Sequence, residues 1–437
     1  MNSKLILWSI TVGLGGFLFG LDTAVISGAE KDIQRLWNLD DISLGFTVAT
    51  ALYGTVFGAA FGGIPADMFG RKKTLLWIGI LFFASALGAA IAQDPTTFMI
   101  FRFIGGLSIG ASSVVAPVYI SEIAPPQYRG RMVISFQFNI VFGILIAYVS
   151  NYLFDGFGGD DDWRWMLGVV AIPSLIFSIM VLFTPESPRW LITRKGDEAH
   201  AREVLSITED DVDKAVNEIK ASQGENNGVQ ESFFNKKFRT PIILAFLFAF
   251  FNQLSGINAI IYFAPRIFEM TGLGQSSALL STAGIGVVNL VATILGWYLI
   301  DRLGRRTLMY IGSIGYIISL ALVAYAFYTE GHNLTMYYIF AFIASHAVGQ
   351  GAVIWVFISE IFPNSVRASG MAWGSLTHWV FAALIANTFP YFANKFGGAP
   401  IFAFFSFMMV LQLLYVMFMM PETKGVSLED LQKRLIK

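Results

Sequence analysis

The chain has 437 residues, of which 55% are hydrophobic and 14% are charged, and its formal net charge is −1. Soluble domains carry about 25% charged residues, so the composition indicates an integral membrane protein, and the near-zero charge argues against a nucleic-acid partner. Cysteine is absent, which excludes a disulfide framework, and the four histidines are scattered, so the sequence has neither a metal-ligand cluster nor any other sign of an enzyme.

Apolar windows long enough to cross a bilayer as a helix, about 20 residues, occur twelve times along the chain. The first follows a single lysine and has no small-residue cleavage site, so we interpret it as a retained helix rather than a signal peptide. The predicted spans are residues 5–28, 44–66, 74–92, 97–120, 132–153, 164–184, 240–263, 276–299, 307–328, 336–358, 370–392 and 399–420.

Lysine and arginine are concentrated on one side of these spans. That side comprises both termini and the loops 67–73, 121–131, 185–239, 301–306 and 359–369, and it holds 23 of the 29 basic residues. The positive-inside rule therefore predicts that both termini are cytoplasmic. The charged segment 185–239 has helical spacing, with Val212, Val216 and Ile219 on one face, so we expect short cytoplasmic helices there, followed by a flexible end at 222–230.

Three pairs of motifs reveal an internal repeat. "DMFGRK" at Asp67 returns as "DRLGRR" at Asp301, "SEIAPPQYRGR" at Ser121 as "SEIFPNSVRASG" at Ser359, and "PESP" at Pro185 as "PETK" at Pro421. These offsets are nearly equal, which predicts two copies of a six-helix unit. One known transporter plan places the substrate site between such halves. The predicted divisions are 1–184 (first bundle), 185–239 (cytoplasmic helical linker), 240–420 (second bundle) and 421–437 (cytoplasmic tail).

Two ionisable residues, Asp22 and Arg102, fall inside predicted spans at similar depth. Each is five or six residues from the outer end of its span, roughly 7–9 Å below that face. Pairing would offset the cost of a buried charge, about 2.5–3.5 kcal/mol on insertion scales. Such a pair can be a static structural contact, or a proton-coupling switch in which protonation of Asp22 frees it from Arg102.

Amide side chains inside the spans are candidates for a polar binding site, because amides both donate and accept hydrogen bonds. Gln253 and Asn258 are five residues apart, more than one helical turn, so both reach one cavity best if the helix is broken, and Gly256 favours such a break. The alternative for each amide is a hydrogen bond that only packs the bundle. The candidates are Gln137, Asn252, Gln253, Asn258 and Asn289.

Charged residues are duplicated at the predicted cytoplasmic ends of the spans. Isolated surface pairs are worth about 0–1 kcal/mol, but the duplication favours a functional network. Its predicted members are Asp67, Arg71, Glu122, Arg129, Arg131, Glu186 and Arg189 in the first half, and Asp301, Arg305, Arg306, Glu360, Arg367 and Glu422 in the second.

Taken together, these motifs resemble the major facilitator superfamily, and within it the sugar porter family, over nearly the whole chain. The motifs are "GGIPADMFGRKK" (62–73), "RFIGG" (102–106), "PVYISEIAPPQYRGR" (117–131), "PESPRWL" (185–191), "NQLSGINAIIYFAP" (252–265), "DRLGRR" (301–306), "WVFISEIFPNSVR" (355–367) and "PETKG" (421–425). The resemblance implies an all-α integral membrane protein with twelve helices in two pseudo-symmetric bundles. It also implies alternating access and a monosaccharide substrate, and we expect a bacterial inner-membrane protein that is functional as a monomer.

The resemblance implies sugar contact at Phe19, Gln137, Gln253, Asn258, Asn289, Trp355 and Trp379. Two positions depart from the family pattern, because Asn252 stands where a glutamine is usual and His378 replaces an amide, for which we favour a role at the pocket edge. We expect Tyr262 and Phe263 to form part of an extracellular gate. The charged network is implied to tie the two halves together when the protein opens outward.

Proton-linked symporters of this family carry an aspartate at the position of Asp22, whereas facilitative uniporters carry an asparagine. We therefore predict proton–sugar symport, with H⁺ as the coupling ion, no other cofactor, and xylose slightly favoured over glucose and galactose. The alternatives are a facilitative uniporter and, less favoured, a nutrient receptor, which would need a longer cytoplasmic tail. A drug–proton antiporter would lack the "PESPRWL" and "NQLSGIN" signatures seen here.

Overall fold

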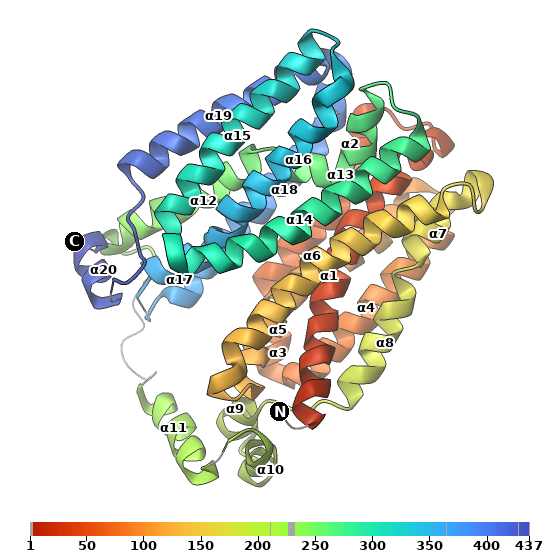
Figure 1. Ribbon diagram of the computed structural model, residues 1–437. Helices are drawn as coiled ribbons and strands as arrows, with labels where there is room; N and C mark the ends of the chain where they lie inside the picture. The colour runs from red at the N-terminus through yellow and green to blue at the C-terminus, as the bar shows by residue number, and fades with distance from the viewer. Residues whose placement is uncertain (1–2, 210, 226–231, 364, 427, 437) are drawn as a thin grey trace. The chain divides into compact units, whose positions relative to one another are not determined.

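The computed structural model describes residues 3–209, 211–225, 232–363, 365–426 and 428–436, and all regular structure in these residues is helical (Figure 1). This confirms the all-α class. Eleven helical segments within these residues are long and apolar enough to cross a membrane, namely Lys4–Leu36, Asp41–Phe61, Arg71–Ile91, Pro95–Ile123, Met132–Phe154, Gly159–Leu182, Lys236–Glu269, Gln275–Leu303, Arg305–Tyr328, His332–Ile361 and Gly398–Phe418.

The remaining predicted span, 370–392, lies within α18 (Arg367–Phe396), a helix of 30 residues. This helix is not among the eleven apolar segments. Polar side chains in its middle, including Thr377, His378 and Asn387, lower its mean hydropathy. The predicted span 370–392 is therefore present as a helix, and its polar residues explain why its mean hydropathy is low.

The helices follow the predicted order along the chain. The first repeat contains α1 (Ser3–Leu36), α2 (Asp41–Phe61), α3 (Gly63–Phe69), α4 (Arg71–Ile91), α5 (Pro95–Ile123), α6 (Pro126–Phe154), α7 (Asp162–Gly168) and α8 (Ala171–Leu182). The second contains α12 (Arg239–Leu254), α13 (Ile257–Glu269), α14 (Gln275–Leu303), α15 (Arg305–Tyr328), α16 (Thr335–His346), the π-helix η5 (Ala347–Gly351), α17 (Ala352–Ile361), α18 and α19 (Gly398–Phe418).

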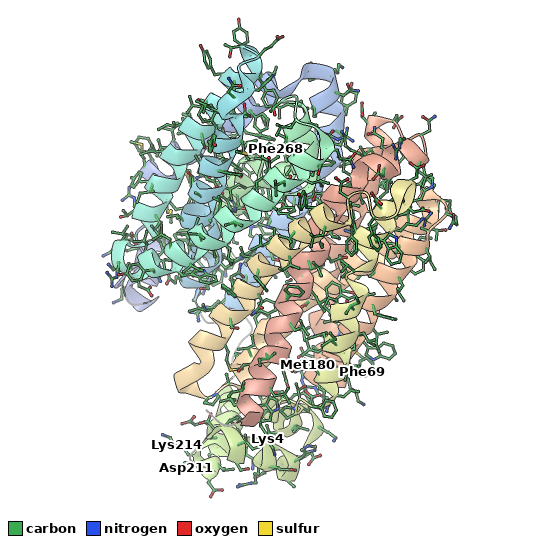
Figure 2. All side chains as sticks on the ribbon, turned by 45° about the vertical axis from the view of Figure 1, so that its right-hand side comes forward. Lys4, Phe69, Met180, Asp211, Lys214 and Phe268 are labelled. Atoms are coloured by element: carbon green, nitrogen blue, oxygen red, sulfur yellow. The ribbon has the colours of Figure 1, made fainter. Side chains whose placement is uncertain are left out.

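Short helices occupy the predicted linker and tail: α9 (Pro188–Trp190), the π-helix η2 (Leu191–Lys195), α10 (Glu198–Thr208), α11 (Val212–Glu225) and α20 (Leu428–Leu435). Val216 on α11 is buried while Val212 and Ile219 are half-buried, as expected for an amphipathic helix. Figure 2 shows Lys4 of α1 at the same end of the first unit as Lys214 of α11 and Asp211 just before that helix. The predicted flexible end at 222–230 lies largely outside the residues whose structure is described.

Large apolar side chains cover the outside of the helices. Trp77, Ile91, Phe407 and Phe418 are each more than half exposed. A soluble protein of this size does not expose so much apolar surface, whereas hydrocarbon chains of a bilayer would cover it. Inside, small residues let helices approach closely, and a side chain at Gly20 of α1 would meet the Ile140 carbonyl oxygen of α6.

The chain forms two compact units. The first comprises Met1–Thr23, Tyr53–Ala147 and Leu167–Gln230, and the second comprises Ala24–Leu52, Tyr148–Met166 and Glu231–Lys437. The second unit thus combines the later part of α1, the first part of α2 and the end of α6 with the helices of the second repeat. One reason is direct contact, because the Tyr148 hydroxyl of α6 donates to the Ile261 carbonyl of α13 at 3.0 Å. The predicted divisions at residues 184 and 240 stay predictions from the repeat.

Candidate functional site

Asp22 and Arg102 form a buried ion pair inside the first unit. Arg102 of α5 donates from Nη1 to Asp22 Oδ1 at 2.9 Å, and from Nη2 to the Asp22 backbone carbonyl at 3.3 Å. The two side chains are only 2% and 3% exposed. Asp22 Oδ2 and Arg102 Nε have no hydrogen-bond partner among the described residues. The pair is therefore incomplete, and one carboxylate oxygen has unused capacity to accept a hydrogen bond or a proton.

The helix of the seventh span is broken where the spacing of Gln253 and Asn258 favours a break. Helix α12 ends at Leu254, and α13 begins at Ile257. Gly256 between them has φ +83°, a left-handed conformation that glycine adopts without steric cost. A side chain there would come within 2.4 Å of the Phe405 ring. The break shifts α13 relative to α12, so side chains five residues apart can meet.

Three amides, Asn252, Gln253 and Asn258, meet at this break and form the polar cluster together with His378. Asn258 Nδ2 donates to Gln253 Oε1 at 2.7 Å, and Gln253 Nε2 donates to Asn252 Oδ1 at 2.9 Å. Gln253 Nε2 also lies 3.2 Å from both ring nitrogens of His378 on α18. All three amides are buried. The cluster thus collects donors and acceptors from three helices in one place inside the second unit.

Two tryptophans lie beside the polar cluster. The His378 ring centroid is 5.3 Å from that of Trp355 on α17 and 4.9 Å from that of Trp379 on α18. Indole rings offer apolar faces, and the adjacent amides offer hydrogen bonds. Such a combination suits a ligand with many hydroxyl groups and one apolar face, which is the chemistry of a sugar.

The remaining predicted sugar contacts are Asn289, Phe19 and Gln137. Asn289 lies on α14, where its Oδ1 is 3.5 Å from the Thr293 hydroxyl one turn further along. Phe19 on α1 and Gln137 on α6 belong to the first compact unit. The structure therefore brings together six predicted residues within the second unit, namely Asn252, Gln253, Asn258, Trp355, His378 and Trp379.

Tyr262 and Phe263, the predicted gate residues, are both buried in α13. Phe263 has non-helical backbone angles, φ −129° and ψ 22°, and thereby kinks the helix two residues before Pro265. Its ring stacks on that of Phe389 in α18, with 5.2 Å between centroids. The second predicted gate residue thus lies at a kink, and its ring contacts a helix of the same repeat.

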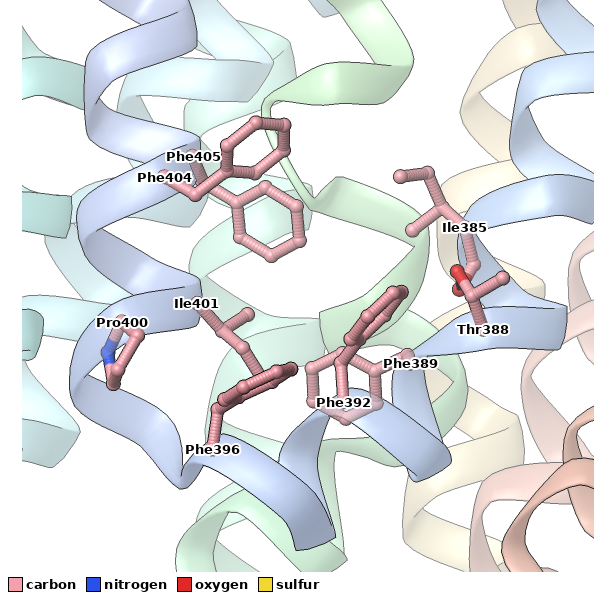
Figure 3. Close-up of a pocket in the computed structure, with 9 residues that line it drawn as sticks. All are labelled: Ile385, Thr388, Phe389, Phe392, Phe396, Pro400, Ile401, Phe404 and Phe405. Atoms are coloured by element: carbon pink, nitrogen blue, oxygen red, sulfur yellow. Dashed lines mark hydrogen bonds between the residues drawn. The ribbon is translucent and has the colours of Figure 1, made fainter.

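An apolar cavity of about 280 Å³ lies between α18 and α19, beside the helix break (Figure 3). Phe405, which lines it, also covers Gly256, and Phe389 on its wall stacks on Phe263. Among the described residues that line it, Thr388 alone has a polar side chain, so the cavity does not suit a polyhydroxylated ligand. Its lining residues are Ile385, Thr388, Phe389, Phe392, Phe396, Pro400, Ile401, Phe404 and Phe405.

The first charge cluster, Asp67, Arg71, Glu122 and Glu186, lies within the first unit. Arg71 binds both carboxylate oxygens of Glu122 at 2.8 and 3.0 Å, and its Nη1 lies 3.0 Å from Asp67 Oδ1. Glu186 accepts hydrogen bonds from the backbone N–H groups of Arg71 and Lys72 at the start of α4. A carboxylate at a helix N-terminus is favoured by its unpaired N–H groups and by the helix dipole.

The second charge cluster, Asp301, Arg305, Glu360 and Glu422, repeats this arrangement in the second unit. Arg305 binds both oxygens of Glu360 at 3.2 and 2.9 Å, and its Nη1 lies 3.3 Å from Asp301 Oδ1. Glu422 accepts from the backbone N–H of Arg305 at 3.0 Å. Burial raises the pKa of Glu422, but hydrogen bonds from backbone N–H groups outweigh burial and hold that pKa below its usual range.

The other charged residues predicted for the network have individual surroundings. Arg306 donates to the carbonyls of Val416 and Met417, and Arg367 donates weakly to the Phe362 carbonyl at 3.4 Å. Arg189 lies in the short helix α9. Arg129 and Arg131 lie on α6, and their side chains fall outside the described part of the chain.

Comparison with known proteins identifies the family. The model of the family described as "Sugar (and other) transporter" matches residues 8–435. The chain belongs to this sugar transporter family. It is 37% identical over 431 residues to the D-xylose transporter of Levilactobacillus brevis, covering 97% of this chain and 94% of that protein.

A second relative and a solved structure agree with this assignment. The chain is 36% identical over 445 residues to the arabinose-proton symporter of Bacillus subtilis, covering 99% of this chain and 95% of the relative. The inward open structure of the xylose transporter XylE from E. coli superposes with a TM-score of 0.87 at 33% identity, covering 99% of this chain and all of that one. Family membership and the spanning helices make the chain a multi-pass membrane protein.

One buried charge of this sugar transporter family member was not predicted as a site residue. Glu30 lies on α1 beyond the predicted end of the first span at residue 28, but the helix continues to Leu36. Its side chain is fully buried and pairs with Arg266 of α13 at 2.6 Å. The buried residues Ile26, Ala29 and Ile33 continue the helical spacing through this segment, and that spacing is the signal that would have extended the helix.

A buried polar network around η5 was also not predicted. The Tyr316 hydroxyl of α15 lies 2.5 Å from His346 Nδ1 and 3.3 Å from Gln350 Oε1. Gln350 hydrogen-bonds Gln412 of α19, which donates to the Ser313 hydroxyl at 2.8 Å. The network coincides with a π-helix, a feature found frequently at functional sites. Its partners are up to 99 residues apart in the chain, so no local sequence pattern predicts the network.

Proposed function

We propose that this chain is a proton-coupled monosaccharide symporter that works by alternating access, with xylose or a glucose-like sugar as its substrate. The observation that supports this most directly is the buried Asp22–Arg102 pair, 2.9 Å between Oδ1 and Nη1. Relatives named as a D-xylose transporter and an arabinose-proton symporter agree with the proposal. We further propose that the protein lies in the bacterial inner membrane with both termini cytoplasmic, is functional as a monomer and uses no cofactor besides H⁺.

In this proposal, protonation of Asp22 changes the state of the pair. A proton on Asp22 removes the negative charge that holds Arg102, and the Oδ2 atom, which has no hydrogen-bond partner among the described residues, is the available position. A buried arginine without its carboxylate is costly, so the protein gains by rearranging around it. Proton binding thereby biases the equilibrium between the two conformations of the carrier.

Sugar binding would replace the hydrogen bonds within the polar cluster. Gln253 now uses Asn252 and Asn258 as partners, so its donors and acceptor are occupied within the protein. A sugar hydroxyl donates and accepts, and can exchange with each of these bonds without leaving a buried group unpaired. Trp355 and Trp379 would cover the apolar face of the ring. Phe19, Gln137 and Asn289 remain proposed contacts on the family resemblance.

The two charge clusters are proposed to act as a conformational latch at the cytoplasmic side. Each cluster ties an arginine at the start of a helix, Arg71 or Arg305, to a glutamate from another helix. The proposal is that these clusters link the two halves when the carrier opens outward, and that the linkage breaks when it opens inward. Its strength would then set the ratio of the two conformations.

The substitution Asp22→Asn tests proton coupling. In proteoliposomes with a pH gradient, we expect the variant to lose uphill accumulation of labelled xylose or glucose, because the neutral amide cannot be protonated. Exchange of labelled for unlabelled sugar without a gradient should remain, because it needs no net proton movement. The matched control is Asp160→Asn, whose side chain is 95% exposed and which should keep full accumulation. A variant that still accumulates sugar in a pH-dependent manner contradicts the proposal and favours another coupling residue. A parent that never concentrates sugar favours the uniporter.

A further inference from the structure

Glu30 and Arg266 form the most deeply buried ion pair of the second unit among the described residues. The Glu30 side chain on α1 is 0% exposed, and that of Arg266 on α13 is 14% exposed. Arg266 donates from Nε to Oε1 at 2.9 Å and from Nη2 to Oε2 at 2.6 Å, so both carboxylate oxygens are bound. The Nη2 atom also donates to Gln34 Oε1 at 2.6 Å. This bidentate geometry is the strong form of an arginine–carboxylate contact.

The pair joins helices from the two sequence repeats. Helix α1 belongs to the first repeat and α13 to the second, and 236 residues separate the partners. Further contacts of the same kind lie in the second unit: Lys31 pairs with Glu269, and Asn394 of α18 donates to Asp41 of α2 at 2.5 Å. The end of α1 near Leu36 is therefore attached to the second repeat by polar contacts, of which Glu30–Arg266 is the most buried.

Burial makes this pair energetically different from its neighbours. The Arg35–Asp160 pair is exposed, 67% and 95% by side chain, and such pairs contribute little. Glu30 has no contact with solvent, so removing its charge would leave the largely buried Arg266 with Gln34 as its one hydrogen-bond partner among the described residues. Separation of α1 from α13 would rehydrate the arginine. Loss of the carboxylate therefore penalises the closed arrangement far more than the open one.

We propose that Glu30 and Arg266 form an electrostatic lock that holds the outer end of α1 against α13 and must break before sugar enters from outside. The assignment of this end as outer, and the alternation between open and closed states, rest on the proposed function. The lock differs from the predicted gate at Tyr262 and Phe263, because it acts through charge and connects the two repeats. It also differs from the Asp22–Arg102 pair, whose helices α1 and α5 both belong to the first repeat.

Spin labels on introduced cysteines test the lock directly, since the chain contains no native cysteine. We place labels at Leu36→Cys, at the end of α1, and at Leu273→Cys, in the connection between α13 and α14, and both positions are exposed. We measure the distance distribution of the two labels by pulsed electron resonance without sugar. In the labelled parent the short distance should dominate. Glu30→Gln should raise the ratio of long to short distances at least about tenfold. A change of this size is expected because the substitution destabilises the closed state relative to the open one.

Two further variants separate a lock from a folding defect. The charge swap, Glu30→Arg together with Arg266→Glu, restores opposite charges, and we expect it to return most of the population to the short distance. Arg35→Gln removes an exposed charge on the same helix and should leave the distribution as in the parent. The proposal is overturned if Glu30→Gln leaves the distances unchanged, or if the swap resembles the single variant rather than the parent.

Transport kinetics provide a second readout that a merely structural residue would not move. An unlocked carrier populates the outward-open state more, so the apparent KM for external sugar should fall several-fold. The maximal rate should also fall, because reclosure loses its driving contact. An unchanged KM would contradict the lock. If the parent transports no sugar but the label distances still respond to Glu30→Gln, the proposed function fails and the electrostatic lock stands.

Discussion

Gln253 is the residue through which most of the candidate sugar site is connected. It accepts from Asn258, donates to Asn252 and approaches His378 of α18. The sequence predicts that Gln253 and Asn258 reach one cavity, because they lie five residues apart with Gly256 between them. It does not predict that His378, 125 residues away, meets Gln253, since no local pattern encodes a contact between distant helices.

Replacing Gln253 by leucine should weaken sugar binding. The variant removes one set of hydrogen bonds to the ligand and leaves Asn252 and Asn258 without their partner, and a hydrogen bond of this kind is worth about 1 kcal/mol or more. We expect sugar affinity, measured by calorimetry or exchange, to fall at least about tenfold. Gln412→Leu is the matched control, because this buried amide belongs to the separate network around η5. Equal losses of affinity in both variants would contradict a specific role for Gln253.

The broken helix α12–α13 is the element that sets the geometry of the site. A break near Gly256 could be foreseen, because a glycine lies between two amides at a spacing that one continuous helix does not bring together. The kink at Phe263 and the π-helix η5 could not, since neither has an unusual local sequence apart from Pro265. Twelve helical spans were also predictable from composition, although element ends were not, and α1 extends eight residues beyond its predicted end.

Gly256→Ala should cost more stability than the same change at a free turn. Gly256 and Gly272 both have positive φ, +83° and +89°, so alanine is strained at either position by about 1–2 kcal/mol. A side chain at position 256 also meets the Phe405 ring at 2.4 Å, whereas one at position 272 meets nothing within 4 Å. Thermal unfolding in detergent should show a larger loss of Tm for Gly256→Ala, accompanied by weaker sugar binding. Equal losses of Tm would mean that Phe405 moves aside freely.

At the scale of the whole molecule, the repeat is visible in the charge clusters. Glu186 accepts from the N–H groups that follow Gly70, and Glu422 accepts from those that follow Gly304. The motifs predict which residues belong to these clusters, because each motif is short and is duplicated. They do not predict the buried contacts between repeats, such as Glu30 with Arg266, because these have no counterpart in the repeat.

Glu360→Ala tests the role of the latch in the conformational equilibrium. The carboxylate binds Arg305 and accepts from the Thr423 hydroxyl at 2.5 Å, so its loss leaves a partly buried arginine with two weaker partners, Asp301 and the Ile300 carbonyl. If the latch stabilises the outward-open state, spin labels at Met68→Cys and Leu303→Cys should report a shift toward the inward-open one. Glu218→Ala, an exposed acid on α11, is the control. Identical distributions for parent and Glu360→Ala would remove Glu360 from the latch.

The low hydropathy of α18 has a consequence for how the protein is made. The polar residues of α18, which include His378 of the polar cluster, make its transfer from the translocon into lipid less favourable than that of an apolar segment. Only Gly397 separates α18 from the strongly apolar α19. We therefore expect the two helices to enter the bilayer together as a hairpin during biosynthesis. The apolar α19 would supply the favourable free energy of partitioning that the more polar α18 lacks.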